Sequence, residues 1–77
     1  MSAAKPVRIP DAAALGAALR AARHARHLRL EEAALGAGVG VRFLSELERG
    51  KPTAQLAPTL RVVASLGLEF MLVDPSD

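Results

Sequence analysis

Two histidines are the first candidates for chemistry in this 77-residue sequence. His24 and His27 stand three residues apart, a spacing that places both imidazole rings on one face of a helix. A closed zinc site needs four ligands, normally Cys or His, and the chain contains no Cys and no further His. The sequence therefore predicts that both rings are exposed to solvent and that the protein binds no metal and no other cofactor.

Two further patterns are similar to catalytic or phosphate-binding sites but lack essential parts. Ser45 lies in an expected helix, and the sequence arranges no His–Asp pair around it, so it is a poor candidate nucleophile. The segment Gly36-Ala37-Gly38-Val39-Gly40 is similar to a dinucleotide loop, but its third glycine is misplaced and no strand precedes it. The sequence therefore predicts a protein that is not an enzyme.

The remaining candidates are the basic side chains, which are unevenly distributed. Residues 1–29 contain six Lys and Arg against one acid, a net charge of +5. Residues 30–77 contain four bases against seven acids, a net charge of −3. A basic half on a small domain indicates a polyanion as partner, although charged runs are also common on solvated faces.

Size and composition indicate one small helical domain. Ala and Leu, which are strong helix formers, dominate the 51% of residues that are hydrophobic, and only 3% are aromatic. A chain this short buries only about 60% of the surface that its unfolded form exposes. No disulfide can stabilise it, so we expect it to form an oligomer.

The hydrophobic residues are too dispersed for a membrane protein. No apolar run approaches the ~20 residues that are needed to span a bilayer. The first ten residues lack the apolar stretch of a secretory signal. We therefore expect a soluble, cytoplasmic protein with no membrane partner.

The apolar spacing divides the chain into an arm (1–10), a helical domain (11–67), a strand (68–73) and a tail (74–77). Asp11 is expected to cap the first helix, and Gly38 to turn the chain after the second. The four helices are expected at Ala12 to about His27, Leu30 to Gly36 or Ala37, Val41 to Arg49, and about Leu56 to Leu66.

The second and third expected helices form a helix-turn-helix unit from Leu30 to Glu48. Ala34 is small enough for the two helices to approach closely, and Val39 follows the turn and fills the angle between them. The same pattern also fits an ordinary corner between two helices of a bundle. The unit alone therefore leaves DNA binding and a purely structural role open.

Four segments carry a resemblance to a known family: LRLEEAA (28–34), AGV (37–39), FLSELERGKP (43–52) and LRVVASLGLE (60–69). The first three resemble the Xre (lambda-repressor-like) helix-turn-helix family, and the last resembles its HipB-like antitoxin branch. The resemblance extends over about residues 12–73. It implies an all-α bundle of about four helices and a regulator that binds double-stranded DNA at a palindromic operator. It further implies an antitoxin that represses its own operon and binds a HipA-like kinase toxin.

The resemblance also implies roles for individual residues. Arg23 and Glu48 match a buried ion pair that holds the scaffold together. The positions that face the major groove match Val41, Arg42, Phe43 and Glu46. Arg42 is the strongest candidate for base recognition because a guanidinium group binds guanine O6 and N7 in a fork. Phe43 fits either a thymine methyl contact or a place in the core. The expected DNA phosphate contacts are Arg29, Ser45, Arg49 and Lys51.

The apolar segment Leu68–Val73 has no partner strand within the chain. We expect it to pair antiparallel with the same strand of a second copy, as the resemblance to HipB-like proteins also implies. The residues expected at this homodimer interface are Leu68, Phe70, Met71 and Leu72. The alternative is that the tail packs back on its own helices as coil.

Three positions differ from the family pattern. Arg29 and Gly40 stand where Ser or Thr usually caps the two helices of the unit, and each lost cap costs about 1 kcal/mol. Leu30 replaces a Gln that usually contacts the DNA backbone. These differences keep a second hypothesis open, a helical adaptor for protein partners in which DNA binding is weak or lost.

Overall fold

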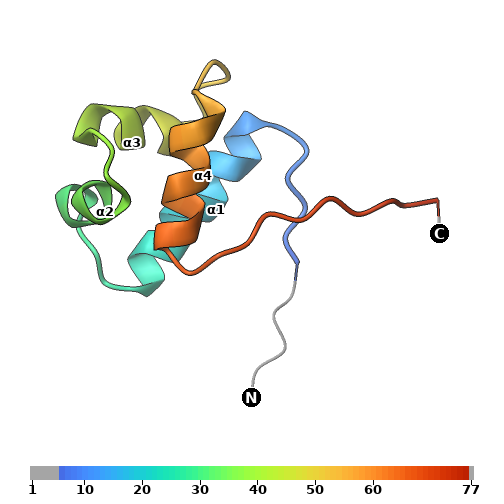
Figure 1. Cartoon of the computed structure of the whole chain (residues 1–77), viewed down its shortest axis with the longest axis horizontal. Helices are drawn as coiled ribbons and strands as arrows, with labels where there is room; N and C mark the ends of the chain where they lie inside the picture. The colour runs from blue at the N-terminus through green and yellow to red at the C-terminus, as the bar shows by residue number, and fades with distance from the viewer. Residues whose placement is uncertain (1–5, 77) are drawn as a thin grey trace.

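The computed structural model describes residues 6–76, which form a bundle of four helices (Figure 1). The helices are α1 (Ala12–Ala25), α2 (Leu30–Ala37), α3 (Val41–Glu48) and α4 (Leu56–Ser65). α3 packs against α1 and α2, and α2 also packs against α4. The predicted all-α bundle is confirmed. Of the predicted arm, residues 1–5 lie outside the described part, and residues 6–10 form neither helix nor strand.

The first helix begins where the sequence predicts and ends earlier. Asp11 caps it, since its Oδ1 accepts a hydrogen bond of 2.8 Å from the Ala14 N–H. α1 ends at Ala25, two residues before the expected His27, which instead adopts a left-handed φ of 56°. The N–H of Leu28 then bonds the Arg23 carbonyl at 3.2 Å, which closes the helix end in a Schellman motif. Glycine usually occupies that left-handed position, so the sequence offered no sign of this helix end.

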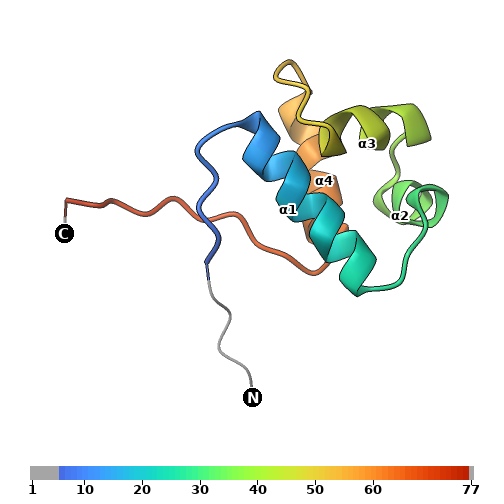
Figure 2. The same ribbon diagram turned by 180° about the vertical axis from the view of Figure 1, so that it is seen from behind.

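The turn between α2 and α3 follows the expected chemistry. Gly38 adopts a φ of 70°, a conformation that costs glycine little. The N–H of Val39 bonds the Ala34 carbonyl at 3.0 Å, so the chain reverses within three residues and starts α3. The two helices therefore meet in a tight helix-turn-helix unit, which lies at one side of the bundle in both the front and rear views (Figures 1 and 2).

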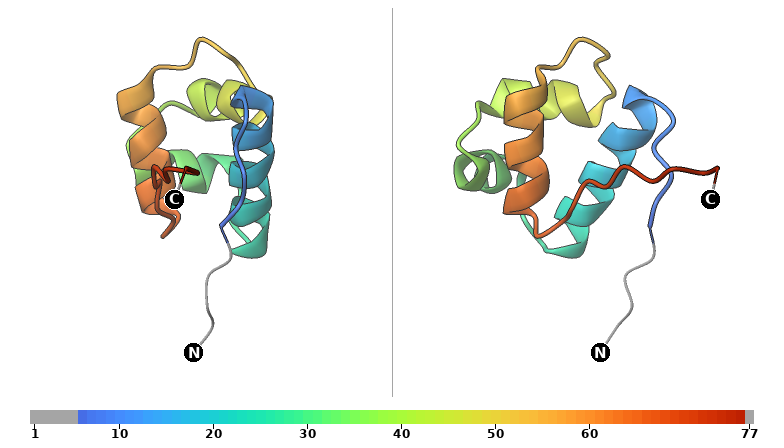
Figure 3. Two further views of the ribbon diagram at one scale, coloured as in Figure 1. Left: turned by 90° about the vertical axis from the view of Figure 1, so that its right-hand side faces the viewer. Right: turned by 45° about the vertical axis from the view of Figure 1, so that its right-hand side comes forward.

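The fourth helix starts after a loop and covers the unit. Its N-cap is Gln55, whose side chain makes no capping hydrogen bond. Pro58 is the third residue of α4, where no N–H is needed for the helical hydrogen-bond ladder. Thr59 is buried, and its hydroxyl donates to the Gln55 carbonyl at 2.6 Å. The view turned by 90° in Figure 3 shows α4 and α1 on opposite sides of the bundle.

The core lies where the four helices meet. Leu19, Leu44 and Val62 are its most deeply buried large side chains, and each contributes about 1.5–3 kcal/mol through burial of apolar surface. The other buried apolar residues are Ala33, Ala34, Ala37, Leu47, Val63 and Leu66. Small alanines on α2 allow α3 and α4 to approach closely, which fixes the position of α3 relative to the rest of the bundle.

The structure of the single chain does not support the predicted β-strand at residues 68–73. Residues 68–74 form no strand, because a strand needs a hydrogen-bonded partner and the described residues supply none. Leu68 packs against the core, and its N–H bonds the Val63 carbonyl at 3.0 Å. Leu68 therefore belongs to the fold of its own chain. Phe70, Met71 and Leu72 are exposed, and Leu72 is completely so.

Candidate nucleic-acid interface

The recognition helix candidate, α3, has one buried side and one exposed side. Leu44 and Leu47 are buried against the bundle. Val41 is 42% exposed, and the Arg42 side chain is 91% exposed. Glu46 lies one helical turn after Arg42, so the two side chains share the exposed side. A surface of this kind could enter a groove without any rearrangement of the core.

Glu46 lies between two cations. Its Oε1 lies 3.0 Å from Lys51 Nζ, and its Oε2 lies 3.4 Å from Arg42 Nε. The hydrogen bond from Lys51, with a smaller contribution from Arg42, lowers the pKa of the Glu46 carboxyl group below its ordinary value. Ion pairs on an exposed surface are weak because water screens them, so Arg42 can exchange Glu46 for another partner at little cost.

Phe43 lies on the border of α3 and packs against the core. Its side chain is half-buried and therefore fills space beside the buried residues of α3. This packing agrees with the core interpretation of Phe43, and its contact with a thymine methyl stays a prediction.

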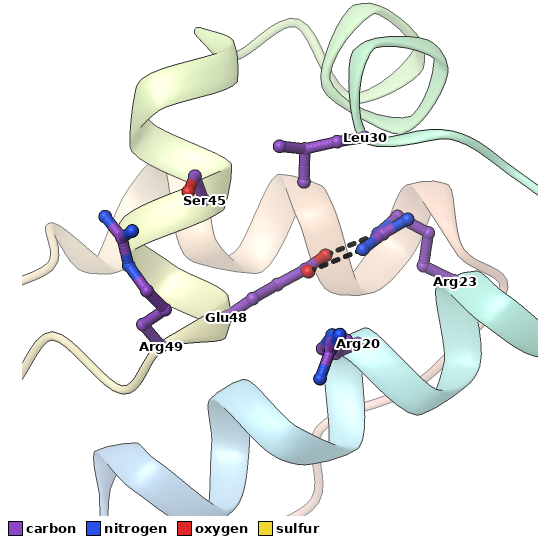
Figure 4. Close-up of a pocket in the computed structure, with 6 residues that line it drawn as sticks. All are labelled: Arg20, Arg23, Leu30, Ser45, Glu48 and Arg49. Carbon is purple, nitrogen blue, oxygen red and sulfur yellow. Dashed lines mark hydrogen bonds and ion pairs between the residues drawn. The ribbon is translucent and has the colours of Figure 1, made fainter.

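Arg23 and Glu48 form a two-point ion pair between α1 and the end of α3 (Figure 4). Arg23 Nε and Nη2 donate to the two carboxylate oxygens at 2.7 and 2.8 Å, and Nη1 donates to the Leu28 carbonyl at 3.0 Å. Both side chains are nearly buried, with 11% and 6% exposure. The hydrogen bond to Glu48 raises the pKa of Arg23, against the opposing effect of burial. This pair links α1 to α3 and has few donors left for a ligand.

An open hollow of about 570 Å³ lies beside this ion pair (Figure 4). Its wall consists of side chains from α1, α2 and the end of α3: Arg20, Arg23, Leu30, Ser45, Glu48 and Arg49. The sequence analysis selected all of these residues except Arg20. The available signal was its spacing of three from Arg23, which places both arginines on the same side of α1.

The start of α2 compensates in part for its missing Ser or Thr cap. The Glu32 carboxylate accepts the backbone N–H of Arg29 at 2.8 Å, which satisfies one free donor at this helix end. The Arg29 side chain is 81% exposed and lies 3.7 Å from the same carboxylate. Gly40 provides no side-chain cap for α3. The acid three residues after Arg29 is a capping signal that the sequence analysis missed.

The four expected phosphate contacts fall in three places. Ser45 and Arg49 line the hollow, with Ser45 on α3 and Arg49 at its C-cap. Lys51 lies in the loop beyond α3 and pairs with Glu46. Arg29 precedes α2 and does not line the hollow. The structure therefore brings together two of these four residues.

Neither histidine lines the hollow. His24 and His27 are exposed, and His24 Nε2 lies 3.5 Å from Arg23 Nη2. Within residues 6–76, no three His, Cys, Asp or Glu side chains gather in a way that could hold a metal ion. In the same range, no helix has the length and apolar character required to cross a membrane.

Comparisons with known proteins identify relatives of this chain. No family model matches the sequence. The chain is 43% identical over 70 residues to the uncharacterized HTH-type transcriptional regulator y4mF of Sinorhizobium fredii (strain NBRC 101917 / NGR234), which covers 91% of this chain and 92% of the relative. The fold of this chain is similar to that of a chain in a solved structure described as a HipB-O4 20mer complex, with a TM-score of 0.81 and 22% sequence identity. The match covers 90% of this chain and 97% of the other. The chain therefore belongs to the family of HTH-type transcriptional regulators.

Proposed function

We propose that this protein is a sequence-specific DNA-binding regulator of transcription, and that α3 enters the major groove of its operator. The observation that carries the proposal is the exposed side of α3, which presents Arg42 in its first turn while Leu44 and Leu47 hold the helix on the core. The naming of the similar protein as a transcriptional regulator supports this function.

The exposed side of α3 offers three kinds of base contact. Arg42 has the donors to bind guanine O6 and N7 in a fork, and the methyl groups of Val41 suit a thymine methyl. The Glu46 carboxylate can accept from cytosine N4. Contacts with DNA phosphates set the position of the helix without reading bases. The residues proposed for these contacts are Arg29, Ser45, Arg49 and Lys51. Phe43 packs on the core with part of its side chain exposed, and a contact with a thymine methyl is proposed for that exposed part.

We further propose that the regulator acts as a homodimer on a palindromic operator. The segment beyond the bundle is apolar and exposed, and exposed apolar surface favours self-association. Its members are Phe70, Met71, Leu72 and Val73. Two-fold symmetry would present two copies of α3 to half-sites about 34–36 Å apart. In this proposal the domain formed by residues 11–67 binds DNA. The segment after Leu68 joins the two copies of the chain.

The proposed physiological role is that of an antitoxin in the cytoplasm. The resemblance of residues 60–69 to the HipB-like branch and the similarity in fold to HipB support a role in repression of its own operon. The expected partner in that role is a HipA-like kinase toxin. Affinity copurification after coexpression with the product of the adjacent gene tests it, and a neighbour that is not a kinase and does not copurify contradicts it.

A direct titration tests DNA binding. Fluorescence anisotropy would compare a labelled duplex from upstream of the gene with a shuffled duplex of the same composition. We expect tighter binding to the upstream duplex and a logarithmic affinity that falls linearly with the logarithm of salt concentration. The adaptor hypothesis predicts that the folded protein binds neither duplex. Two features favour this hypothesis, namely Leu30 and the absence of a side-chain cap at Gly40.

A further inference from the structure

We propose that the hollow between α1 and α3 receives the phosphodiester backbone of the bound duplex, and that Arg20 is a phosphate-binding residue there. This inference rests on the proposed function and adds a contact from α1 to those expected from α2, α3 and the loop. The ligand is a phosphate of double-stranded DNA, held by charge and by hydrogen bonds.

The charge of the hollow favours an anion. Three guanidinium groups and one carboxylate line it. Arg23 and Glu48 neutralise each other through their two-point pair. Within the described residues, no carboxylate lies within ion-pairing distance of Arg20 or Arg49. The hollow thus carries a net charge of about two positive units from side chains on two different elements.

The hollow lies beside the exposed side of α3 that we propose to enter the major groove. Arg49 follows Glu46 by three residues and Ser45 by four, so it joins the exposed side of α3 to the hollow. The major groove is about 12 Å wide and is bordered by phosphates on both sides. When α3 lies in the groove, the phosphates on the side of α1 pass over the hollow.

Two other residues that line the hollow offer few hydrogen-bond donors to a phosphate. Leu30 has no hydrogen-bond donor in its side chain, although it stands at the start of α2 beside the hollow. Arg23 directs Nε, Nη1 and Nη2 to Glu48 and to the Leu28 carbonyl. Arg20 is exposed and has no such commitment within the described residues, so its five N–H donors can reach a phosphate. Arg20 therefore offers the hydrogen-bond donors that Leu30 lacks at this hollow.

The salt dependence of DNA binding tests this assignment. Each phosphate contact contributes about 0.9 to the slope of log affinity against log salt concentration. We expect Arg20→Ala to reduce the slope by about 0.9 per bound subunit and to weaken binding equally to the upstream and shuffled duplexes. Arg20→Lys should restore the slope because it keeps the charge.

Arg61→Ala is the matched control, since it removes an exposed arginine from α4 outside the hollow and should leave the slope unchanged. Circular dichroism verifies that each variant remains folded. A wild-type slope for Arg20→Ala would overturn the inference and leave the proposed function intact. A changed base preference in Arg20→Ala would also overturn it. Wild-type protein that binds neither duplex would contradict the proposed function itself.

Discussion

Gly16 of α1 lies so close to Glu48 at the end of α3 that a Cβ on Gly16 would come within 2.6 Å of the Glu48 carbonyl oxygen. Seven residues later on α1, Arg23 binds the carboxylate of the same glutamate. Glu48 is therefore held through its main chain and through its side chain. This double contact fixes the end of the proposed recognition helix against the rest of the bundle.

Gly16→Ala should destabilise the protein by about 1–3 kcal/mol, because the added methyl group meets backbone atoms that cannot rotate away. Chemical denaturation followed by circular dichroism measures the loss as a lower midpoint. Gly36→Ala is the matched control. It lies in α2 with no atom near the added methyl group, and it should stabilise the helix by about 0.5–1 kcal/mol. Equal effects of the two substitutions would refute the close approach.

Arg23→Ala should cost about 3–5 kcal/mol in the free energy of unfolding, because it leaves the buried Glu48 carboxylate without its partner. Arg26→Ala, on the exposed side of the same helix end, should change stability by less than about 0.5 kcal/mol. Thermal unfolding of both variants provides the comparison. A loss for Arg23→Ala as small as that for Arg26→Ala would show that the pair does not hold the scaffold.

Local residue patterns predicted the helices well, and contacts between distant residues explain what they missed. Asp11 and Gly38 are signals within one turn of the chain, and both act as expected. The end of α1 at Ala25 depends on a left-handed conformation of His27, a position that no glycine marked. Gly16 acquires its role only when α1 meets the end of α3, which no local spacing encodes.

The C-terminal segment shows a different limit of local patterns. Its composition indicates a strand, but a strand forms only with a partner, and the described residues supply none. Leu68 also packs against the core of its own chain. Its N–H donates a hydrogen bond to the Val63 carbonyl near the end of α4. The composition of the segment therefore predicted a preference for β-strand structure, but it did not predict which residues the segment contacts.

Stability should depend on acid pH through Glu46. Its pKa is lowered in the folded state, so its ion pairs stabilise the fold above the ordinary value of 4.5. That contribution disappears as the pH falls through the lowered pKa. The difference in unfolding free energy between wild type and Glu46→Gln should therefore shrink from pH 6 to pH 3, the range to be scanned by denaturation. Lys51→Gln should weaken this pH dependence, and a difference constant over the range would contradict the pairing.

The exposed tail should control self-association. Replacement of Phe70, Met71 and Leu72 by Ser should convert the proposed dimer to a monomer without loss of the helical fold, because all three side chains are exposed on the bundle of a single chain. Sedimentation velocity measures the mass, and circular dichroism measures the helix content. Leu68 is kept, since its packing belongs to the monomer. A triple variant that remains dimeric would place the interface elsewhere.

The most direct test of the account is the base specificity of Arg42→Ala, measured as the affinity ratio between the upstream duplex and a shuffled duplex at one salt concentration. Arg42 is exposed on α3 and pairs only loosely with Glu46, so its removal should leave the fold unchanged. We predict a loss of about 1–3 kcal/mol on the upstream duplex, little change on the shuffled duplex, and relaxed preference at one base pair of each half-site. An equal loss on both duplexes would show that Arg42 binds phosphate, and it would contradict base recognition by the exposed side of α3.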